Sequence, residues 1–181
     1  RRQRQMCIRD RGVIDRFGQI EPKVLIAAAG YRYAGKNLDL TAKLNEILER
    51  LPSLQQLVVV PYSNPAAKAG NFRSAARVSL WQDFYQAGGE PQFTPVSFEQ
   101  PLYILYSSGT TGVPKCIVHG VGGTLLQHVK ELGLHTDLTA DDTLFYYTTC
   151  GWMMWNWLVS GLALGASLVP VSYTHLTLPT S

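Results

Sequence analysis

The sequence predicts an α/β fold in which helices flank parallel or mixed sheets. Residues 22–28 (PKVLIAA) and 57–60 (LVVV) are continuous apolar runs of the length of buried strands. Between them, residues 38–51 carry leucine and isoleucine at helical spacing, and Pro52 follows, where a helix would end. A strand, a helix and a second strand in this order form a βαβ unit, whose two strands are parallel with a right-handed crossover.

After residue 60, the alternation of predicted strands and helices is less regular. Proline and glycine punctuate residues 61–100, where we expect only one short helical segment, at residues 79–85. Apolar or alternating runs then predict a pair of strands joined by a loop, a helix and a further strand, at residues 102–106, 116–119, 123–132 and 144–149. The sheet pattern stops in mid-course, which is typical of a part of a larger domain.

The composition of the chain indicates its size class and the redox state of its compartment. The chain has 181 residues, 46% of them apolar, enough for one globular domain or a large piece of one. Its three cysteines, Cys7, Cys116 and Cys150, are an odd number without a C-x-x-C pair, and no signal peptide is recognisable, so a reducing, cytoplasmic setting is expected. No metal site is expected, because histidines and cysteines never come at ligand spacing. Without activating neighbours, Cys116 and Cys150 are expected to be buried small hydrophobes.

The two ends of the chain differ in composition from the residues between them. Residues 1–11 hold five arginines and one aspartate, while the whole chain has a formal charge of +3, so the remainder sums to −1. A basic arm that binds nucleic acid is one interpretation. We favour another, in which residues 1–12 and 170–181 are not native, because MCIRDR and VSYTHLTLPTS resemble translated adapter or vector sequence. The native domain is then residues 13–169, with no nucleic-acid partner.

The C-terminal quarter invites a membrane interpretation. Residues 143–181 contain no charged side chain, and Gly161 and Gly165 have the spacing of helix-dimer motifs. Asn156 and the lack of a basic flank argue against it. We therefore expect a buried helix and strand over residues 152–169 and no insertion into a membrane, although a membrane-associated helix remains an alternative.

The most unusual stretch is YSSGTTGVPKC, residues 106–116, which is rich in small hydroxyl residues and glycine. Such a loop can bring backbone N–H groups and hydroxyls against a polyphosphate, with one lysine to neutralise charge. It is not a Walker A loop, because counting from Gly109 the second glycine is replaced by Pro114 and Cys116 follows the lysine. Composition alone leaves a ligand-free polar hairpin loop equally open.

Residues 107–115 match the pattern [S/T]-S-G-[S/T]-T-G-x-P-K at every position, and so resemble the signature loop of the adenylate-forming superfamily. The resemblance implies that the chain is part of the large N-terminal domain of such an enzyme. It also implies that the loop closes on the β- and γ-phosphates of ATP while a carboxylate attacks the α-phosphorus. The implied phosphate-binding residues are Ser107, Ser108, Gly109, Thr110, Thr111, Gly112 and Lys115, of which Thr110 and Lys115 are the implied catalytic residues.

Other stretches are similar to one family within this superfamily. KCIVHG, LGLHTDLT and TTCGWMMWNWLVSG resemble the acetoacetyl-CoA synthetases, which join acetoacetate to CoA with ATP·Mg²⁺ through an acyl-AMP. By this resemblance Trp152, Met153 and Met154 form the acyl pocket, and flexible methionines suit a small, partly apolar acid. Simple core packing and an acetate or propionate substrate are the alternatives. The family's magnesium-binding glutamate and small C-terminal domain are absent, so we expect an inactive fragment.

Two further assignments come from the same comparison. The segment GYRYAGK lies where acetyl-CoA synthetases contact the phosphates of CoA, which makes Arg32 and Lys36 candidate CoA ligands. One extra residue separates the two cations here, and a solvated surface turn is the alternative. His119 follows the signature loop, and we expect it to be structural, because an ionised carboxylate substrate needs no general base.

Overall fold

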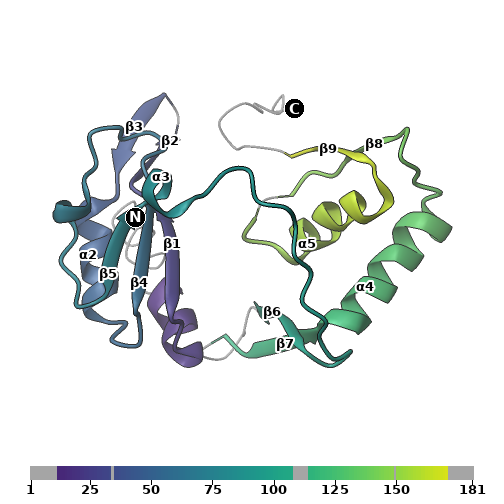
Figure 1. Cartoon of the computed structure of the whole chain (residues 1–181), viewed down its shortest axis with the longest axis horizontal. Helices are drawn as coiled ribbons and strands as arrows, with labels where there is room; N and C mark the ends of the chain where they lie inside the picture. The colour runs from purple at the N-terminus through teal and green to yellow at the C-terminus, as the bar shows by residue number, and fades with distance from the viewer. Residues whose placement is uncertain (1–11, 34, 108–113, 149, 171–181) are drawn as a thin grey trace, which may run out of the picture. The chain divides into compact units, whose positions relative to one another are not determined.

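The structure is a computed structural model that describes residues 12–33, 35–107, 114–148 and 150–170. The chain forms two compact units. The first comprises Arg1–Gln92 and Tyr106–Cys116, and the second comprises Phe93–Leu105 and Ile117–Ser181. Figure 1 shows the strands and helices of each unit. The predicted signature segment therefore belongs to the first unit, although the strands on either side of it run into the second.

The first unit is built on a three-stranded parallel sheet in the order β1-β4-β5. Its strands are β1 (Val24–Ala28), β4 (Gln56–Val60) and β5 (Arg77–Leu80), and α2 (Thr41–Glu49) lies on the connection from β1 to β4 (Figure 1). In the register, Leu25 is paired with Leu57, and Leu57 with Val78. The predicted βαβ unit is confirmed.

The apolar face of α2 and the central strand make the core of this unit. Leu44, Ile47 and Leu48 are buried on α2, while Leu57 and Val59 of β4 are completely shielded from solvent. Full burial of one such side chain contributes roughly 1.5–3 kcal/mol. The spacing of apolar residues in the sequence predicts this face correctly, because it brings α2 onto the sheet.

Two strands outside this sheet were not expected. β2 (Gly30–Tyr33) and β3 (Lys36–Asp39) pair as an antiparallel hairpin, and Gly35 takes a positive φ of 75° at its turn. A Cβ on Gly30 would lie 2.6 Å from the carbonyl oxygen of Leu38, so the backbones meet here only because Gly30 has no side chain. The segment predicted as a possible surface turn is thus the end of a hairpin.

A short 3₁₀ turn, η1 (Ala69–Asn71), and a short helix, α3 (Trp81–Phe84), complete this part of the chain. The helix α3 confirms the short helical segment that the sequence predicts at residues 79–85. A helix at residues 12–20 precedes β1.

The second unit contains two pairs of strands. β6 (Pro101–Tyr106) pairs with β7 (Cys116–Gly120), and β8 (Thr143–Phe145) pairs in parallel with β9 (Ser167–Val169). Its helices are α4 (Val121–Val129), which continues as the π-helix η2 (Lys130–His135), and α5 (Met153–Val159), which continues as the 3₁₀ turn η3 (Ser160–Leu164) (Figure 1). The strands and helices that the sequence predicts here are all present, although β8 is shorter than expected.

The core of the second unit explains one of the glycines of the apolar C-terminal stretch. Buried leucines from η2, β8 and α5 pack together, and a Cβ on Gly161 would lie 3.0 Å from Leu168 and 3.2 Å from Leu144. Gly161 therefore allows close packing within this core. Among the described residues, no helix has both the length and the apolar character needed to cross a membrane.

Candidate functional site

The two ends of the signature segment lie in the described part of the chain. The backbone N–H of Ser107 donates a hydrogen bond to the carbonyl oxygen of Lys115, with 3.0 Å between nitrogen and oxygen. This bond closes the base of the loop, and Lys115 itself is exposed to solvent. Residues 108–113 lie outside the described residues, so the assignments of Ser108, Gly109, Thr110, Thr111 and Gly112 stay predictions.

The helix at residues 12–20 holds the entrance to this loop. The hydroxyl of Tyr106 donates to the carbonyl oxygen of Arg16 at 3.1 Å, and the Arg16 guanidinium lies 5.8 Å from the centre of the Tyr106 ring. Burial raises the pKa of Tyr106 above its ordinary value, the nearby Cys116 adds to this, and Arg16 opposes it. The phenol therefore stays protonated and keeps its role as donor.

The same helix holds the exit from the loop. The side-chain amide of Gln19 donates to the carbonyl oxygen of Pro114 at 3.0 Å, and its amide oxygen faces the Cys116 sulfur at 3.6 Å. Residues more than ninety positions apart are thereby joined within the first unit. One helix thus contacts the chain both before and after the predicted phosphate loop.

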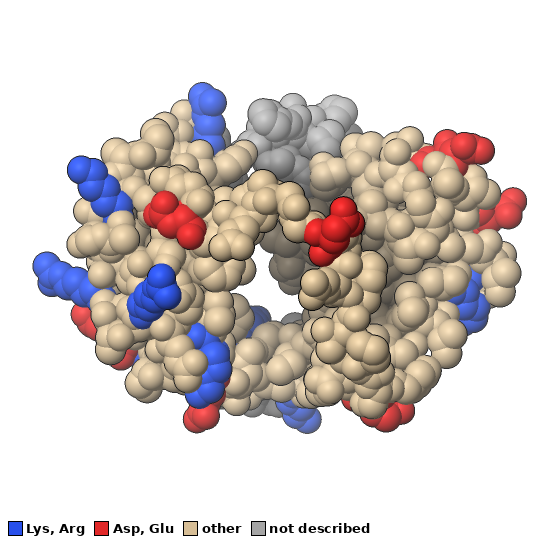
Figure 2. Space-filling view, viewed as in Figure 1, with Lys and Arg blue, Asp and Glu red and all other residues tan. Residues whose placement is uncertain are grey.

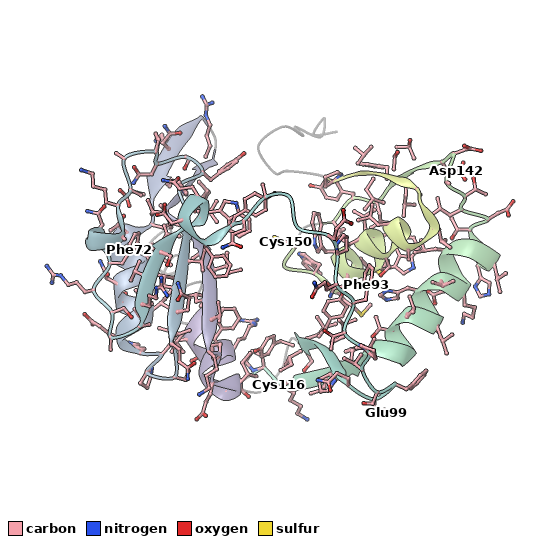
Figure 3. The ribbon with its side chains drawn as sticks, in the orientation of Figure 1. Phe72, Phe93, Glu99, Cys116, Asp142 and Cys150 are labelled. Carbon is pink, nitrogen blue, oxygen red and sulfur yellow. The ribbon has the colours of Figure 1, made fainter. Side chains whose placement is uncertain are left out.

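One prediction about cysteines is wrong. Cys116 and Cys150 are both free thiols exposed to solvent, where burial was expected (Figure 3). Cys116 begins β7, a strand with only one partner strand, and most of that strand is open to solvent. An isolated pair of strands does not bury its side chains, which composition alone does not reveal.

The candidate CoA ligands lie on the β2–β3 hairpin. Arg32 and Lys36 are both exposed. In the hairpin register Arg32 pairs with Asn37, whereas Lys36 pairs with Tyr33. Cross-strand partners share a face of the ribbon and neighbours along a strand alternate, so Arg32 and Lys36 project from opposite faces. Their role in binding CoA stays a prediction.

On the face shown in Figure 2, the basic and acidic side chains of the first unit are interspersed. The basic arm of residues 1–11 lies outside the described residues.

A pocket of about 450 Å³ lies within the second unit. It is bounded by the end of β7, one face of α4 and η2, and the first turns of α5. Its walls are formed by Val118, His119, Gly120, Gly123, Thr124, Gln127, His128, Glu131, Met153, Met154 and Trp157. On α4 and η2 the lining positions recur every three or four residues, so a single helix face forms that wall.

Two of the three predicted acyl-pocket residues line this pocket, and the third does not. Met153 and Met154 line it, but Trp152 does not and is 69% exposed. The assignment of Trp152 stays a prediction. His119 also lines the pocket, so a role beyond structure is open to it by position.

Five polar or aromatic residues of the lining were not singled out from the sequence: Thr124, Gln127, His128, Glu131 and Trp157. The helical spacing of residues 124, 128 and 131 was the signal that could have found this wall.

His128 is held in a defined protonation state. Its Nδ1 lies 2.8 Å from the Ser160 hydroxyl, and that hydroxyl donates its only proton to the carbonyl oxygen of Asn156 at 3.0 Å. We therefore assign the ring proton to Nδ1, which donates a hydrogen bond to the Ser160 oxygen. Burial lowers the pKa of His128 and the nearby His119 lowers it further, while Glu131 acts in the opposite direction. The imidazole is therefore neutral at neutral pH, and Nε2 is a hydrogen-bond acceptor.

Two polar atoms of the pocket residues have no partner. The Thr124 hydroxyl oxygen and the Trp157 indole nitrogen are both shielded from water, and neither makes a hydrogen bond. A buried polar group without a partner costs about 1–3 kcal/mol. The Trp157 ring meets the Tyr146 ring edge-on, with 5.6 Å between the ring centres. Two residues of the pocket lining thus each carry a buried polar atom without a partner among the described residues.

Within the described ranges, no group of three or more His, Cys, Asp and Glu side chains is placed to hold a metal ion. The carboxylates with clearly lowered pKa, Asp39 and Asp142, owe the shift to hydrogen bonds from Thr41 and Thr139 respectively. Both are local turn contacts at the surface.

The chain is similar to known proteins along most of its length. A family model described as AMP-binding enzyme matches residues 9–180. Acetoacetyl-CoA synthetase of Mus musculus is 48% identical over 163 residues, covering 87% of this chain, and acetoacetyl-coenzyme A synthetase of Rhizobium meliloti is 51% identical over 160 residues, covering 88%. The chain spans 24% of the length of each of these relatives.

A solved structure gives the same result for the fold. Acetoacetyl-CoA synthetase from Streptomyces lividans superposes with a TM-score of 0.80 at 45% identity, over 88% of this chain and 24% of that one. The predicted α/β class is confirmed, and so is the resemblance on which residues 107–115 were interpreted. The signature segment, the parallel sheet and these relatives lead to one assignment: the chain belongs to the AMP-binding enzyme family.

Proposed function

We propose that this chain is part of an acid–thiol ligase that activates acetoacetate. In the first half-reaction a carboxylate oxygen of acetoacetate attacks the α-phosphorus of ATP, and pyrophosphate leaves. In the second, the CoA sulfur attacks the acyl carbon, AMP leaves with the former carboxylate oxygen, and the thiol proton goes to solvent. The products are acetoacetyl-CoA, AMP and pyrophosphate.

The observation that carries this proposal is the match of residues 107–115 to the signature pattern, in a chain 48–51% identical to relatives named for acetoacetate activation. In this proposal the departing pyrophosphate is bound by Lys115 and by the loop hydroxyls, including those of Ser107 and Thr110. Donors aimed at a developing charge stabilise the transition state more than the substrate, which is how electrostatic catalysis works. The bond between Ser107 and Lys115 supports this role because it fixes the loop base.

The pocket of the second unit supports the choice of acid. Its volume of about 450 Å³ lies in the range of small-molecule sites, and Met153 and Met154 offer an adaptable apolar wall. We assign the acyl chain to this pocket. Arg32 and Lys36 remain our candidates for the CoA phosphates. In this proposal ATP enters as its Mg²⁺ complex.

The test is carboxylate-dependent exchange between ATP and pyrophosphate, measured with the full-length protein that carries this chain. Acetoacetate, acetate, propionate and 3-hydroxybutyrate are supplied in parallel. Exchange that is fastest with acetoacetate supports both the loop and the pocket assignment. Exchange led by acetate or propionate keeps the mechanism and overturns the substrate, while no exchange with any acid overturns the proposal. The 181-residue chain alone is expected to give none.

A further inference from the structure

Two residues that line the pocket carry hydrogen-bond donors with no partner among the described residues. Thr124 is only 9% exposed, and its hydroxyl has no partner; the indole N–H of Trp157 is likewise buried and unpaired. A threonine on a helix usually bonds back to a carbonyl one turn earlier, and Thr124 does not. Both residues line the same pocket, from α4 and from α5.

Their chemistry restricts what can pair with them. An indole nitrogen only donates, so its partner must be an acceptor, and a hydroxyl can donate to the same kind of group. Two favoured side-chain rotamers are open to threonine on a helix, so the Thr124 hydroxyl can turn towards a ligand. A carbonyl oxygen, with its two lone pairs, can accept from both donors at once.

The neighbouring histidine does not compete for this role. Because His128 is protonated at Nδ1 and neutral, its free nitrogen Nε2 accepts and cannot donate to a carbonyl. Gln127 uses its amide group on Glu131. Among the described lining residues, the buried donors without a partner are those of Thr124 and Trp157.

We propose that Thr124 and Trp157 bind the ketone oxygen of the acyl chain and so select a 3-oxo acid over an unsubstituted acid of the same length. The inference rests on the proposed function and deepens it. Acetoacetate carries this oxygen and butanoate has a methylene group in its place. With butanoate both donors stay buried and unpaired, and sites built to hydrogen-bond a substrate group discriminate strongly against analogues that lack it.

The experiment compares kcat/KM for ATP–pyrophosphate exchange with acetoacetate and with butanoate in the full-length protein. Thr124→Val keeps the shape and removes the hydroxyl, and Thr124→Ser is the matched control that keeps the hydroxyl. For one lost hydrogen bond we expect Thr124→Val to lower the acetoacetate value about five- to tenfold while the butanoate value changes less than about twofold. Trp157→Phe should change the ratio in the same direction, and Thr124→Ser should largely preserve it.

The ratio of the two acids separates selectivity from folding, because a loss of folded protein lowers both values equally. Equal losses in Thr124→Val, or an unchanged ratio, would overturn the inference while exchange with acetoacetate in the unsubstituted protein still upheld the proposed function. No exchange with either acid in that protein would overturn the proposed function itself.

A second readout does not depend on a variant that must be active. In protein labelled with ¹⁵N-tryptophan, the Trp157 indole resonance, assigned as the one lost in Trp157→Phe, should move downfield with saturating acetoacetate and not with butanoate. An identical response to both acids would contradict the pairing with a ketone oxygen.

Discussion

The base of the signature loop and the pocket of the second unit differ in whether their polar groups have hydrogen-bond partners among the described residues. At the loop base the polar groups of Tyr106, Ser107 and Gln19 have partners within the protein. In the pocket, Thr124 and Trp157 are buried without partners. A loop for a charged polyphosphate has to be held at both ends, whereas a selective acyl pocket must keep donors free for a neutral oxygen. In our proposal the residues of the loop base position the loop, and the two unpaired donors select the acid.

Removing the loop's cation should have the largest effect. If Lys115 neutralises the departing phosphates, Lys115→Ala should lower exchange about 10²–10³-fold with every acid, the scale found for lost transition-state donors. The preference among acids should not change. Lys68→Ala, which removes another exposed lysine of the same unit, is the matched control. A loss confined to one acid would show that Lys115 acts on the acyl chain.

The acyl pocket should respond in the complementary way. Met154 lines the pocket, and Met154→Thr shortens its wall, so the ratio of acetoacetate to propionate exchange should shift about tenfold or more, as for a missing methylene group. KM for ATP should remain unchanged. Trp152→Ala shifts the same ratio if the family resemblance is right, although Trp152 does not line this pocket. An unchanged ratio in Met154→Thr would refute the pocket assignment.

The helix at residues 12–20 should have a smaller effect that is restricted to the nucleotide. Gln19→Ala removes the hydrogen bond to Pro114 at the exit of the loop, and one lost hydrogen bond should raise KM for ATP about two- to tenfold. The ratio between acids should stay constant, and Gln19→Glu should not rescue because a carboxylate cannot donate to the Pro114 carbonyl. Gln55→Ala, at an exposed glutamine of the same unit, serves as control. A shift in acid preference would mean that the contact is not specific to the loop.

Sequence reasoning worked where a pattern repeats and failed where partners come from far along the chain. The α2 face and strands β1 and β4 were predictable because leucines recur at helical spacing and apolar runs are continuous. The strand β5 was missed, since its four residues join the sheet through pairing with β4 rather than through a pattern of their own. Gln19 was missed for the same reason, because its loop contact is to Pro114, 95 positions away. Thr124 was missed although its helical spacing to residues 128 and 131 was a usable signal.

The smallest expected effect concerns the pH dependence of stability. The pKa of His128 is lower in the folded chain than its ordinary value of 6.5, chiefly through burial. At a pH between these two values, His128 binds more protons in the unfolded chain than in the folded chain. The contribution of His128 to the free energy of unfolding should therefore be fully present above pH 6.5 and should fall as the pH drops towards the folded pKa. The melting temperature of His128→Gln should therefore decline less over this interval than that of the unsubstituted protein. A parallel decline would mean that the protonation of other groups dominates. A smaller decline would support the assignment of Nε2 as a free acceptor in the pocket, since that assignment requires the neutral ring.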